Sequence, residues 1–133
     1  MRYMLDTNMI SFLVRGNASV LEALKAHRQD FLCISALTLA EIKFGLARKG
    51  NPARLSDAMD KVLSPIEVLP FDADCAVSYG DIRSFLEKGG SPIGAMDMLI
   101  AAHAAQTDCI LVTDNTKAFA RVPHLMIENW LQR

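Results

Sequence analysis

The sequence lacks the cysteine patterns that mark a disulfide-stapled or zinc-bound domain. It has three cysteines, an odd number, and no pair has C-x-x-C spacing. Cys33 and Cys109 lie within apolar runs, where a free cysteine behaves as a small hydrophobic residue. No group of His and Cys has the spacing of a zinc site. We therefore expect free thiols, a reducing compartment such as the cytoplasm, and a fold without disulfides.

Long apolar runs are also missing. No stretch reaches 18 apolar residues, and the first apolar run ends at Asp6, so we expect neither a membrane span nor a signal peptide. The phosphate-binding motifs G-x-x-x-x-G-K-[ST] and G-x-G-x-x-G are absent, which leaves nucleotide binding without support. At 133 residues with no shift in composition, the chain is long enough for one core, and we expect a single domain over residues 1–133.

Short, continuously apolar segments alternate with segments of helical period, which predicts an α/β fold with a parallel sheet covered on both faces. The expected strands are Arg2 to Leu5, Phe31 to Ile34, Ile66 to Leu69, Ile110 to Thr113 and a weaker one at Met126 to Glu128. The expected helices are Thr7 to Val14, Val20 to Ala26, Ala36 to Arg48, Ala53 to Leu63, Ala73 to Lys88 and Met96 to Gln106.

Acidic residues follow several of these strands. Asp6 comes directly after the first strand, Asp114 follows the strand ending at Thr113, and Glu41 lies in the second turn of the helix after Phe31 to Ile34. Asp97 lies in the first turn of a helix that is apolar almost all round. In open parallel sheets the ligand crevice lies beyond the carboxyl ends of the strands. We therefore expect these four carboxylates to face one crevice.

Each acid taken alone also has a structural explanation. Asp6 is a good N-cap for the helix that follows it, and Asp114 suits an Asx-type turn. Asp97 gains from the helix macrodipole, by about 0.3 to 1 kcal/mol. Glu41 fits neither a cap nor a turn. The coincidence of four such positions favours a common functional site over four separate explanations.

Four carboxylates in one pocket would repel one another unless a cation bound between them. Hard oxygen ligands without His or Cys suit Mg²⁺ or Mn²⁺. A magnesium ion held by carboxylates leaves positions for water and phosphate oxygens, which is the arrangement used in phosphoryl transfer. Outside this pocket the 14 basic residues would face 11 of the 15 acidic ones, so the remaining surface would be mildly basic.

Four blocks of the sequence resemble the PIN-domain ribonucleases, and within them the VapC toxins of bacterial toxin–antitoxin pairs. The resemblance runs from Met4 to Trp130. The blocks are Met4-Leu5-Asp6-Thr7-Asn8, Ser35-x-x-Thr38-x-x-Glu41-x-x-x-Gly45, Pro92-Ile93-Gly94-x-x-Asp97-x-x-Ile100-Ala101-x-His103-Ala104 and Val112-Thr113-x-Asn115-Thr116-x-x-Phe119-x-Arg121-Val122.

This resemblance implies a three-layer α/β/α PIN-like domain with a mainly parallel five-stranded sheet and a Mg²⁺- or Mn²⁺-dependent endoribonuclease site. Asp6, Glu41 and Asp97 match the family's regular acidic positions, and Asp114 is the fourth expected catalytic and metal-binding residue. Family members differ over whether the first or second residue after the strand-ending threonine is acidic. The residues expected to support the carboxylates are Thr7, Ser35, Thr113 and Asn115.

The resemblance also implies partners. Family members form dimers and are inhibited by a VapB antitoxin, and the toxin–antitoxin complex binds operator DNA. Their substrates are structured RNAs such as tRNA or rRNA, cleaved by a metal-activated water. From their places after the last acid, Lys117 and Arg121 are candidates for contact with the RNA backbone. We expect His103 to pack within its helix, and His27 and His124 to lie at the surface.

Two other functions fit parts of the pattern. A phosphohydrolase or phosphoacceptor domain also has an Asp after its first strand. Such a domain generally needs a second acid near that Asp, but this chain has Asn8 there. It also needs a lysine at the end of the last strand, but Lys117 lies beyond the strand end. A catalytically silent RNA-binding module of the same fold would not need all four acids.

Overall fold

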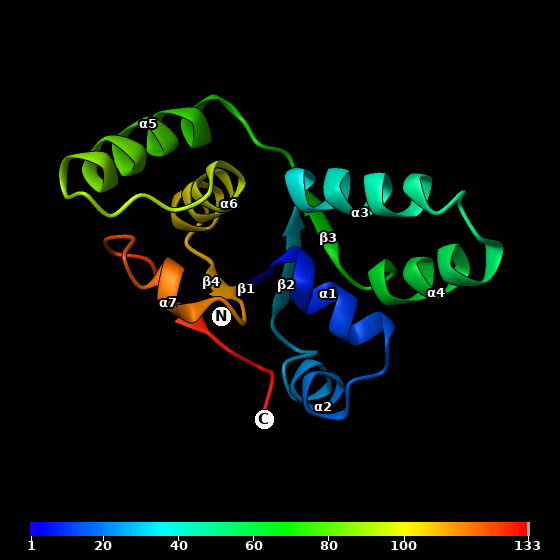
Figure 1. The fold of residues 1–133 in the computed structure, drawn as a ribbon. Helices are drawn as coiled ribbons and strands as arrows, with labels where there is room; N and C mark the ends of the chain where they lie inside the picture. Colours follow the sequence, from blue (N-terminus) through cyan, green and yellow to red (C-terminus); the bar gives the residue numbers. More distant parts are fainter. Residues whose placement is uncertain (133) are drawn as a thin grey trace.

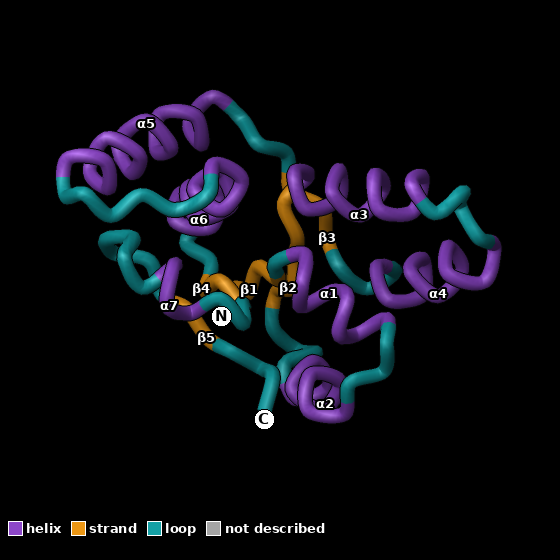
Figure 2. Tube along the Cα trace, in the orientation of Figure 1, coloured by secondary structure: helices purple, strands orange, loops and turns teal. Residues whose placement is uncertain are grey.

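Five parallel strands form the central layer of the computed structural model, which describes residues 1–132 (Figures 1 and 2). The strands are β1 (Arg2–Leu5), β2 (Phe31–Ser35), β3 (Glu67–Leu69), β4 (Ile110–Val112) and β5 (Ile127–Glu128). Their order across the sheet is β3-β2-β1-β4-β5, and all four neighbouring pairs are parallel. The expected α/β fold is confirmed, and the sheet is parallel throughout.

The helices follow the predicted pattern closely. They are α1 (Thr7–Val14), α2 (Ala18–Ala26), α3 (Ala36–Arg48), α4 (Ala53–Leu63), α5 (Ala73–Lys88), α6 (Ala95–Gln106) and α7 (Thr116–Phe119). The bounds of α1, α3, α4 and α5 agree with those read from the sequence. Only α7 was not predicted, because four residues are too few to display a helical period.

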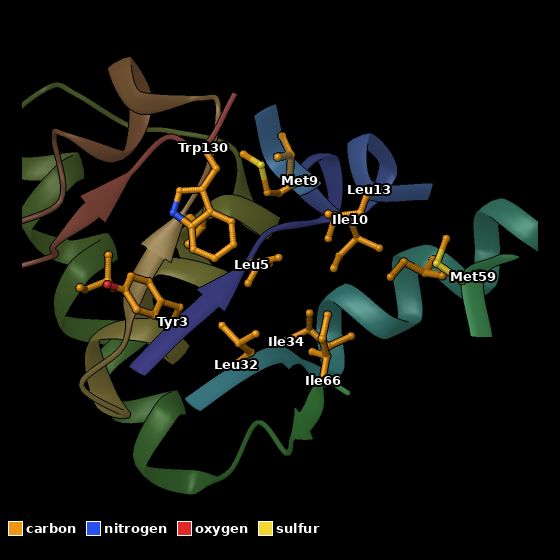
Figure 3. Close-up of a cluster of buried hydrophobic side chains, with 14 of the residues drawn as sticks. Tyr3, Leu5, Met9, Ile10, Leu13, Leu32, Ile34, Met59, Ile66 and Trp130 are labelled. Atoms are coloured by element: carbon orange, nitrogen blue, oxygen red, sulfur yellow. The ribbon is translucent and has the colours of Figure 1, made fainter. Parts of the chain in front are cut away.

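Two hydrophobic cores lie on opposite faces of the sheet. Side chains alternate along a strand, so Tyr3 and Leu5 of β1 enter one core while Met4 enters the other. The first core packs β1, β2 and β4 against α1 to α4, and Figure 3 shows Leu5, Ile10 and other members of it. The second packs the same strands against α5, α6 and α7. This arrangement explains the continuously apolar strands, except at the edge strand β3, where Val68 is 40% exposed.

The three cysteines are free, as the sequence predicts, and all three are buried, including Cys75, which lies outside the apolar runs. Cys33 and Cys109 belong to the second core, with their Sγ atoms 3.8 Å apart, far longer than a disulfide bond of about 2.05 Å. Their burial supports the interpretation of these residues as small hydrophobic side chains.

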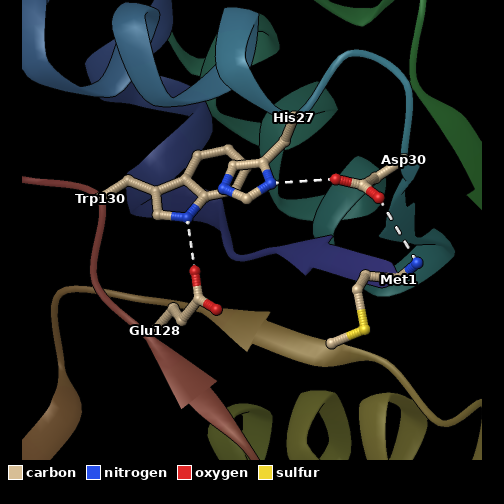
Figure 4. Close-up of polar contacts among 5 residues, drawn as sticks. All are labelled: Met1, His27, Asp30, Glu128 and Trp130. Carbon is tan, nitrogen blue, oxygen red and sulfur yellow. Dashed lines mark hydrogen bonds and ion pairs between the residues drawn. The ribbon is translucent and has the colours of Figure 1, made fainter.

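His27 does not lie freely at the surface, contrary to our expectation. Its half-buried ring stacks on Trp130, with the ring centroids 5.0 Å apart, and its Nδ1 lies 3.0 Å from a carboxylate oxygen of Asp30 (Figure 4). The Trp130 indole N–H donates to Glu128, at 3.1 Å. These contacts join the end of α2 to the segment that follows β5. His124 is exposed, as predicted.

Within residues 1–132, none of the helices combines the length and apolar character needed to span a membrane.

Candidate active site

The register of the sheet places Asp6 beside Thr113. Leu5 of β1 pairs with Val112 of β4, and the Asp6 backbone N–H donates to the Val112 carbonyl at 3.0 Å. Asp6 and Thr113, which follow these paired residues, therefore lie side by side at the carboxyl edge of the sheet. Both side chains are buried: Asp6 is 7% exposed and Thr113 is fully enclosed.

Asp6 caps α1 and is also a buried charge. Its carboxylate accepts a hydrogen bond from the Met9 backbone N–H at 2.9 Å, so the interpretation as an N-cap is correct. Burial raises the pKa of Asp6, the hydrogen bonds from Thr113 and Met9 oppose that rise, and the negative charges of Asp97 and Asp114 add to it. A cap alone would not need these acidic neighbours.

Glu41 reaches the same edge from the second turn of α3. One of its carboxylate oxygens accepts a hydrogen bond from the Thr7 hydroxyl at 2.5 Å. Thr7 is the first residue of α1 and follows Asp6 directly, so this contact joins the helix after β1 to the helix after β2. A hydrogen bond of this kind is the contact by which a neighbouring hydroxyl orients a carboxylate.

Asp97 is half-buried in the first turn of α6. Burial raises its pKa, and the negative charge of Glu41 raises it further. Gly94, the N-cap residue before α6, provides no side-chain hydrogen bond, and Asp97 is the acid in the first turn of the helix. The helix dipole favours a negative charge there, while the neighbouring acid opposes it.

Asp114 lies in the loop after β4, where the Asn129 side-chain amide donates to its Oδ1 at 3.0 Å. Asn115 is exposed, and its backbone N–H donates to the Thr113 hydroxyl at 3.0 Å. Thr113 therefore organises this loop while it also hydrogen-bonds to Asp6. Of the two residues after Thr113, Asp114 is the one whose charge acts on Asp6.

Neighbouring carboxylates add to the effect of burial on the pKa values of two of the acids, Asp6 and Asp97. Asp6 experiences the charges of Asp97 and Asp114, and Asp97 experiences that of Glu41. Across residues 1–132, however, no three His, Cys, Asp or Glu side chains lie in position to bind one metal ion together. The arrangement is an acidic cluster at the sheet edge, able to attract a cation through one or two direct ligands.

Ser35 has a contact that could not be read from the sequence. Its hydroxyl oxygen caps α3 by accepting from the Leu37 N–H at 3.0 Å, and it lies 2.7 Å from Nδ1 of His103 in α6. His103 is fully buried, as predicted, and burial lowers its pKa. Its Nε2 and the Thr38 hydroxyl are buried without a hydrogen-bond partner among the described residues. The Ser35–His103 pair joins the two helices that carry Glu41 and Asp97.

The two basic candidates differ in their surroundings. Lys117 is exposed in α7. The Arg121 guanidinium donates to the Pro92 carbonyl at 3.3 Å, which fastens the segment after α7 to the loop before α6. Their contact with RNA remains a prediction.

Comparison with known proteins places the chain and its fold in a family. The family model described as the PIN domain matches residues 3–125. The chain is 37% identical to the ribonuclease VapC2 of Rickettsia felis and 38% identical to the tRNA(fMet)-specific endonuclease VapC of Shigella flexneri, with 98% of each chain covered in both comparisons. It is also similar to the crystal structure of VapBC2 from Rickettsia felis bound to a promoter DNA fragment, with a TM-score of 0.93 and 35% identity over 98% of this chain and 100% of that one.

Proposed function

Because the chain belongs to the PIN-domain family and, within it, to the VapC ribonucleases of VapBC toxin–antitoxin systems, we propose that it is a metal-dependent endoribonuclease with Asp6, Glu41, Asp97 and Asp114 at its active site. One observation carries the residue assignment. The charges of Asp97 and Asp114 act on the ionisation of Asp6 at the carboxyl end of β1, and the charge of Glu41 acts on that of Asp97. A parallel α/β sheet binds its ligands at this edge.

The site fits a divalent cation. Burial raises the pKa values of Asp6 and Asp97, and neighbouring acids add to the rise, so a bound cation would offset a charge that the protein leaves uncompensated. Mg²⁺ and Mn²⁺ favour carboxylate oxygens, and Mg²⁺ needs only one or two direct carboxylate ligands. Asp6 and Asp97 would hold the ion, with Glu41 and Asp114 beside them. When bound, such an ion lowers the pKa of a coordinated water and offsets negative charge on the phosphate.

The residues around the acids fix the geometry of the site. Thr7 hydrogen-bonds to Glu41, and the hydrogen bonds that Asp6 accepts from Thr113 and the Met9 N–H oppose the rise in its pKa. Asn129 orients Asp114 through its side-chain amide. These contacts keep the carboxylates in place at the sheet edge, which reduces the reorganisation that the reaction would otherwise need.

We propose a structured RNA, tRNA or rRNA, as the substrate. The Shigella flexneri relative is named for tRNA(fMet), and its similarity covers 98% of both chains, so initiator tRNA is the first substrate to test. Water as the nucleophile would leave a 5′-phosphate and a 3′-hydroxyl.

A VapB-type antitoxin is the proposed partner and inhibitor. The Rickettsia felis structure contains a VapBC complex on promoter DNA. On this basis we propose that the present chain contacts operator DNA only through its antitoxin complex. We further propose a homodimer, from the resemblance to the family, and action in the cytoplasm, from the free cysteines.

Mapping of RNA ends tests the proposal. Purified wild-type protein, Asp6→Asn and Asp72→Asn are each incubated with total tRNA in Mg²⁺ and in excess EDTA. Asp72→Asn is the matched control, because Asp72 caps α5 through the Cys75 N–H just as Asp6 caps α1 through the Met9 N–H.

We expect wild type and Asp72→Asn to cut RNA only in Mg²⁺, and Asp6→Asn to lose roughly 100-fold or more of the rate. Equal cleavage in EDTA would refute the metal dependence. Full activity of Asp6→Asn would refute the assignment of the active site.

A further inference from the structure

Residues 129–132 form a strap that joins the edge of the sheet to α2. Figure 1 shows this red segment leaving β5 and ending beside α2. The middle of the strap packs in the first core through Trp130 and Leu131. Further along, the Gln132 N–H donates to the Ser19 hydroxyl in α2 at 3.0 Å. The strap therefore ties β5 to a helix that carries none of the acids proposed for the active site.

The register of β4 and β5 places Asn129 beside the loop that holds Asp114. Val112 pairs with Glu128, and the Thr113 N–H donates to the Glu128 carbonyl at 2.9 Å. Asp114 and Asn129 each come one residue after this hydrogen-bonded pair, so both leave the sheet at the same edge. Their side chains meet there, because the Asn129 Nδ2 donates to Oδ1 of Asp114 at 3.0 Å.

The Asn129 amide has one orientation that satisfies both of its contacts. Its Oδ1 accepts from the Leu131 backbone N–H at 2.9 Å, while its Nδ2 donates to Asp114. A backbone N–H only donates and an ionised carboxylate only accepts, so turning the amide over would break both hydrogen bonds. The strap itself therefore fixes this side chain so that it presents a donor to the carboxylate.

Trp130 anchors the strap next to Asn129. Its side chain is 6% exposed, and its indole stacks on the His27 ring with an angle of 3° between the planes (Figure 4). The indole also lies against the Tyr3 ring, with the centroids 5.6 Å apart, and its N–H donates to Glu128. Aromatic pairs at such distances stabilise an arrangement beyond the burial of their surface. These contacts hold the backbone immediately after Asn129 in place.

Asp114 depends on such support more than the other proposed site acids do. Asp6 caps α1, and Glu41 and Asp97 lie within α3 and α6. Asp114 is half-buried and lies in the loop between β4 and the four-residue helix α7. A loop residue is more mobile than a helical one unless neighbouring side chains hold it.

We propose that the strap positions Asp114 for RNA cleavage, with Asn129 and Trp130 as positioning residues. Trp130 fixes the strap on α2 and β1, and Asn129 passes that constraint to the Asp114 carboxylate. The proposal rests on the ribonuclease function proposed above. The competing explanation is that the strap only stabilises the fold.

Two substitutions at Asn129 separate these explanations. Asn129→Leu removes both hydrogen bonds of the amide. Asn129→Ser keeps an oxygen that can accept from the Leu131 N–H, as in an ST turn, but its short side chain does not reach Asp114. Asn129 is exposed, so neither variant opens a cavity in a core.

Substitutions at Trp130 test the anchor. Trp130→Leu removes the stack on His27, and Trp130→Phe is the conservative variant that keeps an aromatic ring there. Ile66→Ala is the matched control for lost stability, because Ile66 is buried in the same core, at 7% exposed, and lies outside the strap.

The kcat and KM for cleavage of tRNA in Mg²⁺ are measured well below the unfolding temperature of each variant. The side-chain amide of Asn129 is followed by ¹⁵N NMR in the metal-free protein, which reports on its hydrogen bond independently of activity.

We expect Asn129→Leu and Asn129→Ser to lower kcat about tenfold, with KM changed less than twofold. Trp130→Leu should lower kcat at least threefold and shift the Asn129 amide signals towards those of a solvated amide, while Trp130→Phe recovers most of the rate. Because Trp130 acts through Asn129, Trp130→Leu should lower kcat no further in the Asn129→Leu background. Ile66→Ala should keep the kcat and the amide signals of wild type.

Wild-type kcat in Asn129→Ser would overturn the proposal, since the contact with Asp114 would then be dispensable. Multiplied losses in the double variant, or an equal loss in Ile66→Ala, would assign the strap to stability alone. The Asn129 variants decide the question even if Trp130→Leu does not fold. If wild type failed to cut RNA in Mg²⁺, the ribonuclease function would fail, whereas unchanged Asn129 amide signals in Trp130→Leu would separately refute the anchoring of Asn129.

Discussion

At the start of α1, Asp6 serves both as a helix cap and as a charge close to Asp97 and Asp114. The two roles can be separated by substitution, because asparagine caps a helix about as well as aspartate but carries no charge. Loss of activity in Asp6→Asn without loss of fold would therefore report on the charge alone. The same reasoning makes asparagine the informative substitution at Asp97.

Asp97→Asn should stabilise the metal-free protein in a pH-dependent way. The pKa of Asp97 is raised in the folded state, so ionisation of this group opposes folding. The penalty is complete above the folded pKa and disappears below the unfolded value of about 3.9. We expect the midpoint of urea unfolding to be higher for Asp97→Asn than for wild type near pH 7, with the difference shrinking to nothing as the pH falls towards 3.5.

The control for this prediction is Asp81→Asn, which removes an exposed acid from α5. It should show no such pH-dependent difference from wild type. An Asp97→Asn protein that is less stable than wild type at pH 7 would contradict the claim that the negative charge of Asp97 destabilises the metal-free fold.

Thr7 should matter to activity through its hydroxyl group. Thr7→Val removes the hydrogen bond to Glu41, and residues that orient a ligand in this way contribute about 10- to 100-fold. We expect the rate of RNA cleavage to fall by that factor, while Thr7→Ser, which keeps the hydroxyl, stays within a few-fold of wild type. Equal rates in Thr7→Val and wild type would show that Glu41 needs no such support.

The acids proposed for the active site stand out in the local sequence, and their role stays a prediction. Asp6 ends a buried strand, and Glu41 and Asp97 are the sole acids of apolar helices. The contacts that orient them could not be predicted in the same way. Ser35 and His103 are 68 residues apart, and only the packing of α3 on α6 brings them together.

At the scale of elements, the Ser35–His103 pair joins the N-terminus of α3 to α6. Ser35→Ala should remove the cap of α3 and also leave Nδ1 of the buried His103 without its partner. A lost cap costs about 1 kcal/mol, and an unsatisfied buried group adds about 1 to 3 kcal/mol. We therefore expect a loss of about 2 to 4 kcal/mol in the free energy of unfolding, measured by urea denaturation.

Asn17→Ala provides the comparison, because Asn17 caps α2 through the Val20 N–H and has no buried histidine partner. Its loss should be about 1 kcal/mol. Equal losses in the two variants would show that the contact with His103 adds nothing to the cap.

Four of the helices with a clear period have the predicted bounds, α2 and α6 begin two residues and one residue earlier than predicted, and the ends of the short strands also differ. The segment Ile66 to Leu69 was predicted as a strand, but β3 starts at Glu67, because the Ile66 N–H closes a turn onto the Leu63 carbonyl at 2.9 Å. The strand expected to end at Thr113 ends at Val112, where the chain turns into the loop that holds Asp114. The ends of helices and strands depend on such single hydrogen bonds, and the hydrophobic pattern of the sequence does not reveal them.

At the scale of the whole molecule, two cores fix a sheet whose carboxyl edge gathers negative charge. Folding therefore brings together acids that are apart in the unfolded chain, and a bound cation should relieve that cost. At a Mg²⁺ concentration of ten times Kd, the wild-type protein should gain about 1.4 kcal/mol and unfold several degrees higher. Asp97→Asn should gain much less. Thermal unfolding with and without Mg²⁺ checks this, and equal shifts in both proteins would place the ion elsewhere.

Calorimetric titration with Mn²⁺ tests most directly whether acids from four segments form one cation site. Wild type and the cap control Asp72→Asn should bind the ion with the same affinity, while Asp6→Asn, Glu41→Gln and Asp97→Asn should each bind it at least tenfold more weakly. Undiminished binding in Asp6→Asn and Asp97→Asn, or no binding by wild type, would contradict a shared site at the sheet edge.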